Sequence, residues 1–181
     1  MKTCSNPAID INLNEFPDNL VNLITGLLDD KDYSIKHNAR STLVKMGKTV
    51  IPQMHKLLAS KKEAIRIEAA RIVELIVDRK SISLLIGLLD DTEFDIRWIA
   101  AEGLIRIGRR TILPLLKSIR DRESSYFVNK GARHVLINLQ HEKEKEKLRP
   151  LLQSLDNYRE LGEIAPVEAS RALINVFKCH S

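Results

Sequence analysis

The chain has 181 residues, of which 44% are hydrophobic, 29% are charged and only 4% are aromatic. Seven glycines and six prolines are too few for the many turns of an all-β sandwich, so we exclude that class. The net charge of +5 is small for a dedicated DNA-binding protein, and no apolar run reaches the roughly 18 residues of a membrane span.

The two ends of the chain carry its cysteines, Cys4 and Cys179, and the N-terminus shows no apolar signal segment. In an elongated fold the two residues would lie farther apart than the roughly 7 Å between Cα atoms that a disulfide allows. We therefore predict a reduced, cytoplasmic protein. Residues 1–17 precede the first periodic stretch, and we interpret them as an N-terminal arm or cap.

From residue 18 onwards the sequence predicts pairs of helices, each pair joined by a short turn rich in aspartate. The first helix of a pair is predicted from stretches such as "LVNLITGLL" and "ILPLLKSI". Three prolines near the predicted helix starts fit a first turn, where the missing N–H would lack an intrahelical partner; they are Pro52, Pro114 and Pro150. Gly47 and Gly108 follow second helices and suit the left-handed position just past a helix end.

The second helix of each pair repeats apolar residues at i, i+4, i+8 and i+11, which is one face of an α-helix. Successive copies lie 30 to 32 residues apart. The first column holds Ile35, Ile65, Ile96 and Val128, the second holds Ala39, Ala69, Ala100 and Ala132, and the third holds Leu43, Val73, Leu104 and Leu136. Alanine suits the second column because a small side chain lets two helices approach closely.

This period predicts a stacked helical solenoid, because one hairpin cannot bury its apolar face without neighbours. The expected fold class is all-α, a right-handed α-α superhelix of about five helical hairpins. The fifth copy fits less well: we expect a helix at 145–155, a longer loop, and then a second helix whose Ala169, Leu173 and Val176 match the earlier columns. One solenoid domain would span 18–181, with repeats at 18–47, 48–78, 79–108, 109–140 and 141–181.

The stretch "LLDDTEFDIRWIAAEGLIRIG" at 88–108 resembles a HEAT-like repeat, in the short form found in phycobilisome lyase proteins. That family has an aspartate in the turn and an arginine early in the second helix. The matching pairs here are Asp91 with Arg97 and, less closely, Asp30 with Lys36. The resemblance implies that such charges form a ladder of hydrogen bonds between neighbouring repeats. It implies no single function, because HEAT-like arrays serve many roles.

No catalytic, cofactor-binding or metal-binding set is predicted, so we expect no cofactor and no enzymatic activity. None of the histidines pairs with another ligand residue at a zinc-like spacing. The dipeptide His141–Glu142 resembles the His-Glu motif of deoxyhypusine hydroxylase, a di-iron HEAT-like enzyme, but that enzyme needs several such motifs. We interpret the surrounding "HEKEKEKL" as a solvent-exposed helix start with local ion pairs.

The outer face of the second helices is the candidate partner site. At 100° per residue, Trp98 and Ile105 point away from the core stripe, and the same columns place Ile67 and Ile137 on this face. An apolar strip with a cationic rim predicts a protein or peptide partner in the concave groove of the solenoid. The predicted rim residues are Arg71, Arg106, Lys130 and Arg133. Alternatively, Trp98 folds back onto a neighbouring helix, or a terminal segment covers the strip.

Another aromatic column, formed by Tyr33, Phe94 and Tyr126, lies near the helix starts, and we interpret it as packing between repeats. Our first functional prediction is a non-enzymatic interaction scaffold or adaptor. Residues 97–122 carry seven basic and two acidic side chains, so binding of an anionic ligand or nucleic acid is a second, weaker prediction. A third, an accessory role beside a lyase-type enzyme, follows from the family resemblance alone.

Overall fold

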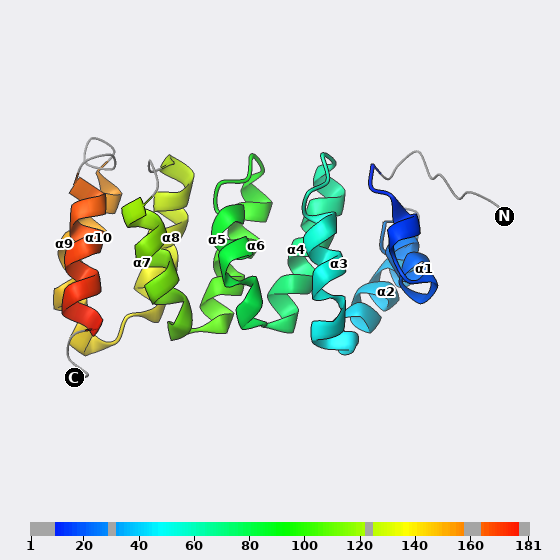
Figure 1. Ribbon diagram of the computed structural model, residues 1–181, viewed down its shortest axis with the longest axis horizontal. Coiled ribbons are helices and arrows are strands. Elements are labelled where there is room, and N and C mark those ends of the chain that lie inside the picture. Colours follow the sequence, from blue (N-terminus) through cyan, green and yellow to red (C-terminus); the bar gives the residue numbers. More distant parts are fainter. Residues whose placement is uncertain (1–9, 29–31, 122–124, 158–163, 178–181) are drawn as a thin grey trace. The chain divides into compact units, whose positions relative to one another are not determined.

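Helices account for all of the regular structure that is described. The computed structural model describes residues 10–28, 32–121, 125–157 and 164–177, so Cys4 and Cys179 lie outside the described residues. The described residues form ten α-helices and no strand, which confirms the all-α repeat solenoid. The chain divides into two compact units, residues 1–76 and 77–181. The helices of both units are labelled in Figure 1.

The first unit contains two helix pairs. Helix α1 (Asp18–Leu27) packs against α2 (Tyr33–Met46), and α3 (Ile51–Leu57) packs against α4 (Glu63–Ile76). The two second helices, α2 and α4, also pack against each other. Each pair therefore covers the apolar face of its neighbour, as a solenoid requires.

The segment ahead of α1 binds back onto the first unit. It contains a short 3₁₀ helix, η1 (Leu13–Glu15), and the side chain of Phe16 is buried. The Asp10 carboxylate accepts hydrogen bonds from the Ser60 hydroxyl and, at 2.7 Å, from the Lys61 amide in the turn between α3 and α4. The Ser60 hydroxyl contributes most to lowering the pKa of Asp10, and the Lys61 amide adds to the effect. This segment thus holds the turn of the second repeat.

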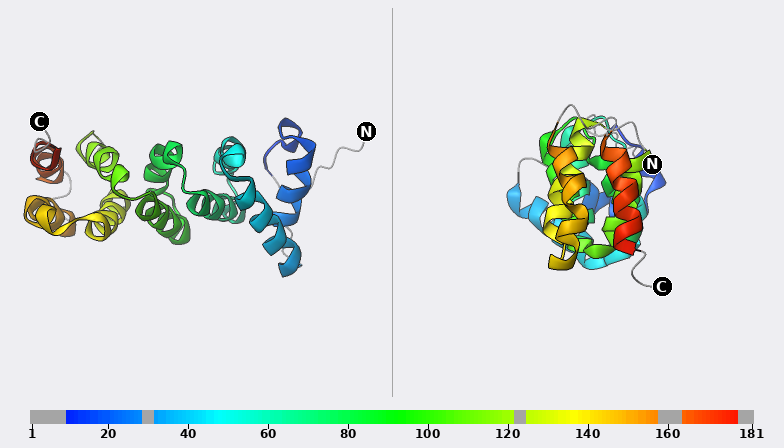
Figure 2. Two further views of the ribbon diagram at one scale, coloured as in Figure 1. Left: turned by 90° about the horizontal axis from the view of Figure 1, so that it is seen from below. Right: turned by 90° about the vertical axis from the view of Figure 1, so that its left-hand side faces the viewer.

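The second unit contains three helix pairs arranged in two rows. The bounds are α5 Ile82–Leu88, α6 Phe94–Ile107, α7 Ile112–Asp121, α8 Tyr126–Leu139, α9 Glu142–Asp156 and α10 Ile164–Phe177. Helix α5 packs against α7 and α6 packs against α8, so first helices form one row and second helices form the other. The last pair is reversed, because α9 packs against α8 and α10 packs against α7 (Figure 2).

The reversed pair corrects the prediction that α10 continues the row of second helices. After α2, α4 and α6 the chain takes a positive φ, 65° at Gly47, 55° at Val77 and 86° at Gly108, and a short 3₁₀ turn then leads to the next first helix. After α8, Gln140 is extended with a φ of −67°, and no such turn separates it from α9. Without the turn, α9 stays in the row of α8. Pro150 consequently lies inside α9 rather than at a helix start.

The predicted columns form most of the core. The four alanines of the second column and the four aliphatic residues of the third are all buried. Ile35 is the exception in the first column, with 47% of its surface exposed. Helix α2 is the first of its row among the described helices, so no earlier second helix covers this residue. Ala169 and Val176 are also buried, because α10 packs against both α7 and α9.

An arginine early in the second helix closes the turn of two repeats. Nη1 of Arg97 donates hydrogen bonds to the carbonyl oxygens of Asp91 and Thr92, both at 2.8 Å. Arg66 makes the same pair of bonds in the turn of its own repeat. These bonds lie within a repeat. A charge contact between neighbouring repeats, as the resemblance implied, is made by Lys36, which pairs with Glu68 on α4 at 3.2 Å. Asp30 lies outside the described residues.

Candidate functional site

A groove of about 330 Å³ lies between α6 and α8 in the second unit. Each helix contributes residues three and four positions apart, which share one helical face. Helix α6 contributes Phe94, Arg97, Trp98 and Ala101, and α8 contributes Tyr126, Phe127, Lys130, Gly131 and His134. This α6–α8 groove therefore combines aromatic rings from two neighbouring repeats with basic side chains.

Small residues set the space between the two helices. Ala101 is buried, and Gly131 packs directly against Leu89, which follows α5. A Cβ atom at position 131 would come within 2.8 Å of the Leu89 Cδ2 atom. A larger side chain there would displace Leu89 or α8 and change the width of the groove.

The aromatic rings of the groove are partly open to solvent. Trp98 is 48% exposed and Phe94 is 65% exposed, and their ring centroids lie 6.4 Å apart with an interplanar angle of 23°. On its other side, Trp98 contacts the His134 ring, with centroids 4.8 Å apart. Tyr126 and Phe127 meet edge to face at 5.8 Å and are also exposed. Clustered exposed aromatic rings are unusual on a soluble protein and mark interaction sites.

Two cations lie over these rings. The guanidinium carbon of Arg97 is 4.1 Å from the centroid of Phe127 and 5.7 Å from that of Phe94. The Lys130 ammonium is 5.7 Å from the centroid of Tyr126. Such cation–π contacts hold the long basic side chains against the groove walls. The walls thus present positive charge next to apolar surface.

A histidine links the groove to an acidic neighbour. Nε2 of His134 forms a hydrogen bond of 3.0 Å with the Glu102 carboxylate, and each of these two side chains is about one third exposed. The contact holds the His134 ring against Trp98. Glu102 does not line the groove, and the charged side chains that line it among the described residues are basic.

The family model for HEAT repeats matches residues 20–105, which run from α1 almost to the end of α6. Paired helices that pack on their neighbours agree with this match. Residues 20–105 are thus HEAT-like repeats, and the described part of the chain is an all-α HEAT-like solenoid. HEAT repeats are commonly protein-interaction scaffolds. A search of curated proteins finds no match to the chain.

Of the predicted partner-binding residues of this HEAT-like protein, Trp98 and Lys130 line the α6–α8 groove. Ile105, Arg106 and Ile137 lie on later turns of α6 and α8 and are not among the residues that line it.

The remaining predicted residues lie elsewhere. Arg133 donates to Asp156 at 2.6 Å and borders a separate hollow of about 260 Å³ formed with α9. Ile67 is half-buried and Arg71 is exposed, and both lie on α4 in the first unit. The structure therefore brings two of the eight predicted residues together in this groove, and the continuous strip stays a prediction.

The prediction that Tyr33, Phe94 and Tyr126 pack between repeats was wrong. All three are exposed, Tyr33 by 77%, and two of them line the α6–α8 groove. They lie in the first turn of their helices. One sequence signal points to them: Phe94 precedes Trp98 by four residues, a spacing that places two side chains on one helical face.

The basic segment 97–122 does not gather its charges on one face. Its residues are distributed over α6, the 3₁₀ helix η4 (Arg109–Thr111) and α7, and α6 and α7 belong to different rows. Arg109 donates to Glu144 at 2.7 Å, and Arg120 donates to Asp121 at 2.5 Å. Arg122 lies outside the described residues.

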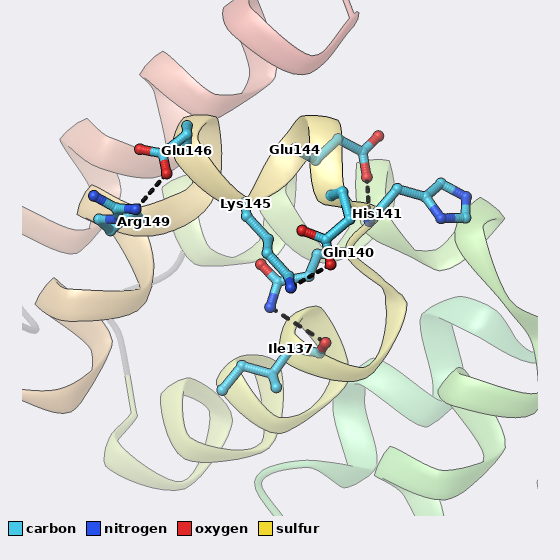
Figure 3. Close-up of polar contacts among 8 residues, drawn as sticks. Ile137, Gln140, His141, Glu144, Lys145, Glu146 and Arg149 are labelled. Carbon is cyan, nitrogen blue, oxygen red and sulfur yellow. Dashed lines mark hydrogen bonds and ion pairs between the residues drawn. The ribbon is translucent and has the colours of Figure 1, made fainter.

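His141 ends the link between α8 and α9, and Glu142 is the first residue of α9. Figure 3 shows His141 and the contacts at this helix start. The His141 amide donates to the Glu144 carboxylate at 3.1 Å, which caps the start of α9. Lys145 pairs with Glu142, and Arg149 pairs with Glu146. These contacts confirm the predicted solvent-exposed helix start with local ion pairs.

Within the described residues, no group of three or more histidine, cysteine, aspartate or glutamate side chains has the geometry to hold a metal ion. None of the helices in the described part of the chain is long and apolar enough to cross a membrane.

Proposed function

We propose that this HEAT-like repeat protein is a non-enzymatic scaffold that binds a protein partner in the α6–α8 groove. One observation carries the proposal: four exposed aromatic side chains from neighbouring repeats converge on a single groove. The cytoplasmic location predicted from the sequence belongs to the same proposal.

The energetics favour Trp98 as the central contact. Tryptophan, tyrosine and arginine contribute most of the binding energy in protein interfaces, and the groove contains all three. Covering the exposed half of Trp98 removes roughly 100 Å² from water, which contributes roughly 2–3 kcal/mol. The contacts with Phe94 and His134 on either side restrict the ring before binding, and this lowers the entropy lost on association.

Nucleic-acid binding is less well supported. A phosphate backbone needs a continuous track of free cations. In segment 97–122, Arg109 and Arg120 are paired with carboxylates, and the charges lie on two different rows of helices. No observation favours a role beside a lyase-type enzyme.

Affinity purification from the native host with two variants tests the proposal. The groove variant is Phe94→Ala combined with Trp98→Ala, and the control is Leu113→Ala, which removes an exposed apolar side chain from α7 in the other row. We expect the groove variant to lose at least one partner that the wild type and the control both retain. Equal recovery with all three proteins, while circular dichroism shows unchanged helicity, would refute a partner site in the groove.

A further inference from the structure

We infer that the α6–α8 groove binds an acidic segment of its partner, in which one apolar or aromatic side chain is flanked by aspartate or glutamate. The inference rests on the proposed function and specifies the chemistry of the bound segment.

The positive charge of the groove determines which charge the bound segment of the partner must carry. Arg97 and Lys130 line it from opposite helices, and no carboxylate lines it among the described residues. Each cation lies over an aromatic ring, so its charge sits next to the space that an apolar side chain would fill. A basic segment would place like charges at short range and is disfavoured, whereas an acidic segment gains charge-assisted hydrogen bonds.

The two cations remain able to bind a carboxylate. The hydrogen bonds of Arg97 to its turn carbonyls involve Nη1, and a guanidinium has five N–H donors. Lys130 lies 3.8 Å from Asp156, a long ion pair, and Arg133 binds the same carboxylate more closely, at 2.6 Å. The Lys130 side chain is 41% exposed, so an incoming carboxylate can replace this weak contact.

The size of the groove fits a side-chain anchor. A volume of about 330 Å³ is at the lower end of the range of about 300–1,000 Å³ for small-molecule pockets. It accommodates one or two large side chains between the rings of Trp98 and Tyr126. Apolar contacts alone would allow many different sequences to bind. The two cations beside the groove favour acidic sequences over neutral and basic ones.

Selection from a random peptide library displayed against the full-length protein tests the inference. We expect the enriched peptides to share one apolar or aromatic residue with aspartate or glutamate within about three positions. Basic enriched motifs, apolar motifs without acidic residues, or no enrichment at all would overturn the acidic assignment.

Charge variants then test the contact in solution by fluorescence anisotropy with an enriched peptide. Lys130→Glu should weaken binding at least tenfold, whereas Lys117→Glu on α7, with the same change in net charge, should alter it less than about threefold. Arg97 is unsuitable for this experiment because it also closes its turn. Replacing the acidic residues of the peptide by lysine should restore binding to the Lys130→Glu variant. Equal effects of the two substitutions would refute a local charge contact.

A random-sequence single-stranded oligonucleotide serves as the competing probe. If the oligonucleotide binds and loses affinity with Trp98→Ala, while no acidic peptide binds, the groove is a nucleic-acid site and the inference is wrong. If the partner found by affinity purification depends on Trp98 but carries no acidic segment, the scaffold proposal stands and the acidic inference alone fails.

Discussion

The space between neighbouring second helices differs between two contacts, α2 with α4 and α6 with α8. Between α2 and α4 in the first unit, Glu68 is buried and binds two cations, Lys36 at 3.2 Å and Arg40 at 2.7 Å. Between α6 and α8 in the second unit, the corresponding space is an open groove with exposed aromatic rings. The first contact is closed by charge pairs at Glu68, although α2 and Leu75 of α4 also line a hollow of about 420 Å³, and the second contact is open at the corresponding place.

A single position in the repeat accounts for much of this difference. Glu68 follows Ile65 by three residues, and Gly131 follows Val128 by three residues, so the two occupy the same place in the second and fourth copies. A glutamate reaches the preceding second helix and fills the space beside it. A glycine has no side chain to do so. The comparison teaches that the repeat fixes the backbone, whereas side chains at two facing positions, Arg40 and Glu68 in one contact and Ala101 and Gly131 in the other, decide whether the contact is closed or open.

The first prediction removes the shared carboxylate of the closed contact, and we expect it to cost the most stability of the polar substitutions. Glu68→Ala leaves Lys36 and Arg40 without their shared carboxylate in a partly buried contact, and we expect a loss of about 2–4 kcal/mol in the free energy of unfolding. Glu102→Ala in the open contact should cost less than about 1 kcal/mol, because Glu102 and His134 are each about one third exposed. Urea unfolding followed by circular dichroism measures both. Similar losses would show that the two contacts are equally important for stability.

Periodicity made most of the fold predictable. The alanine columns were found because burial recurs on one helical face, and Trp98 was found because it lies opposite that face. The position of Phe94 and Tyr126 was not predictable in this way, since one helix alone does not indicate how far its neighbour in the row extends. The reversed last pair was missed because α10 keeps the same buried pattern in either row. Position 140 has no glycine, but Val77 makes the same turn without one, so this residue alone did not reveal the reversal.

The second prediction concerns the turn that follows α6, one of the two helices that form the open groove. Gly108 has a φ of 86°, and a Cβ atom at this position would have no neighbour within 4 Å, so only the backbone conformation opposes a side chain. Gly108→Ala should therefore cost about 1–2 kcal/mol of stability. Val77→Asn is the matched control, because asparagine tolerates the φ of 55° better than valine and should lose no stability. Thermal unfolding of the two variants would contradict this account if Gly108→Ala were neutral.

The third prediction concerns how stability depends on pH through the ion pair between Arg109 and Glu144 at the start of α9. The hydrogen bond from Arg109 is the main cause that lowers the pKa of Glu144 below its ordinary value of 4.5. A carboxylate with a lowered pKa stabilises the fold above its unfolded pKa, and this contribution is lost as the pH falls through the folded pKa. Glu144→Gln should cost about 1 kcal/mol at pH 7, and the difference from the wild type should shrink below pH 4.5.

Glu146→Gln is the control for this pH experiment. Glu146 is exposed and pairs with Arg149 one turn along the same helix, so its loss should have almost no effect at any pH. A difference between Glu144→Gln and the wild type that stays constant from pH 7 to pH 3 would argue that the Glu144 charge does not stabilise the junction.

The last prediction concerns the stability contributed by Trp98, the proposed central contact of the binding site. Trp98→Ala should cost about 1–2 kcal/mol in the free energy of unfolding, because only half of the side chain is buried. Ile96→Ala, two residues away on the buried face, should cost about 2–5 kcal/mol through the cavity it creates. If Trp98→Ala destabilised the protein as strongly as Ile96→Ala, the ring would be part of the core. The open contact would then be a packing feature of the solenoid, and Trp98 would no longer support a binding site.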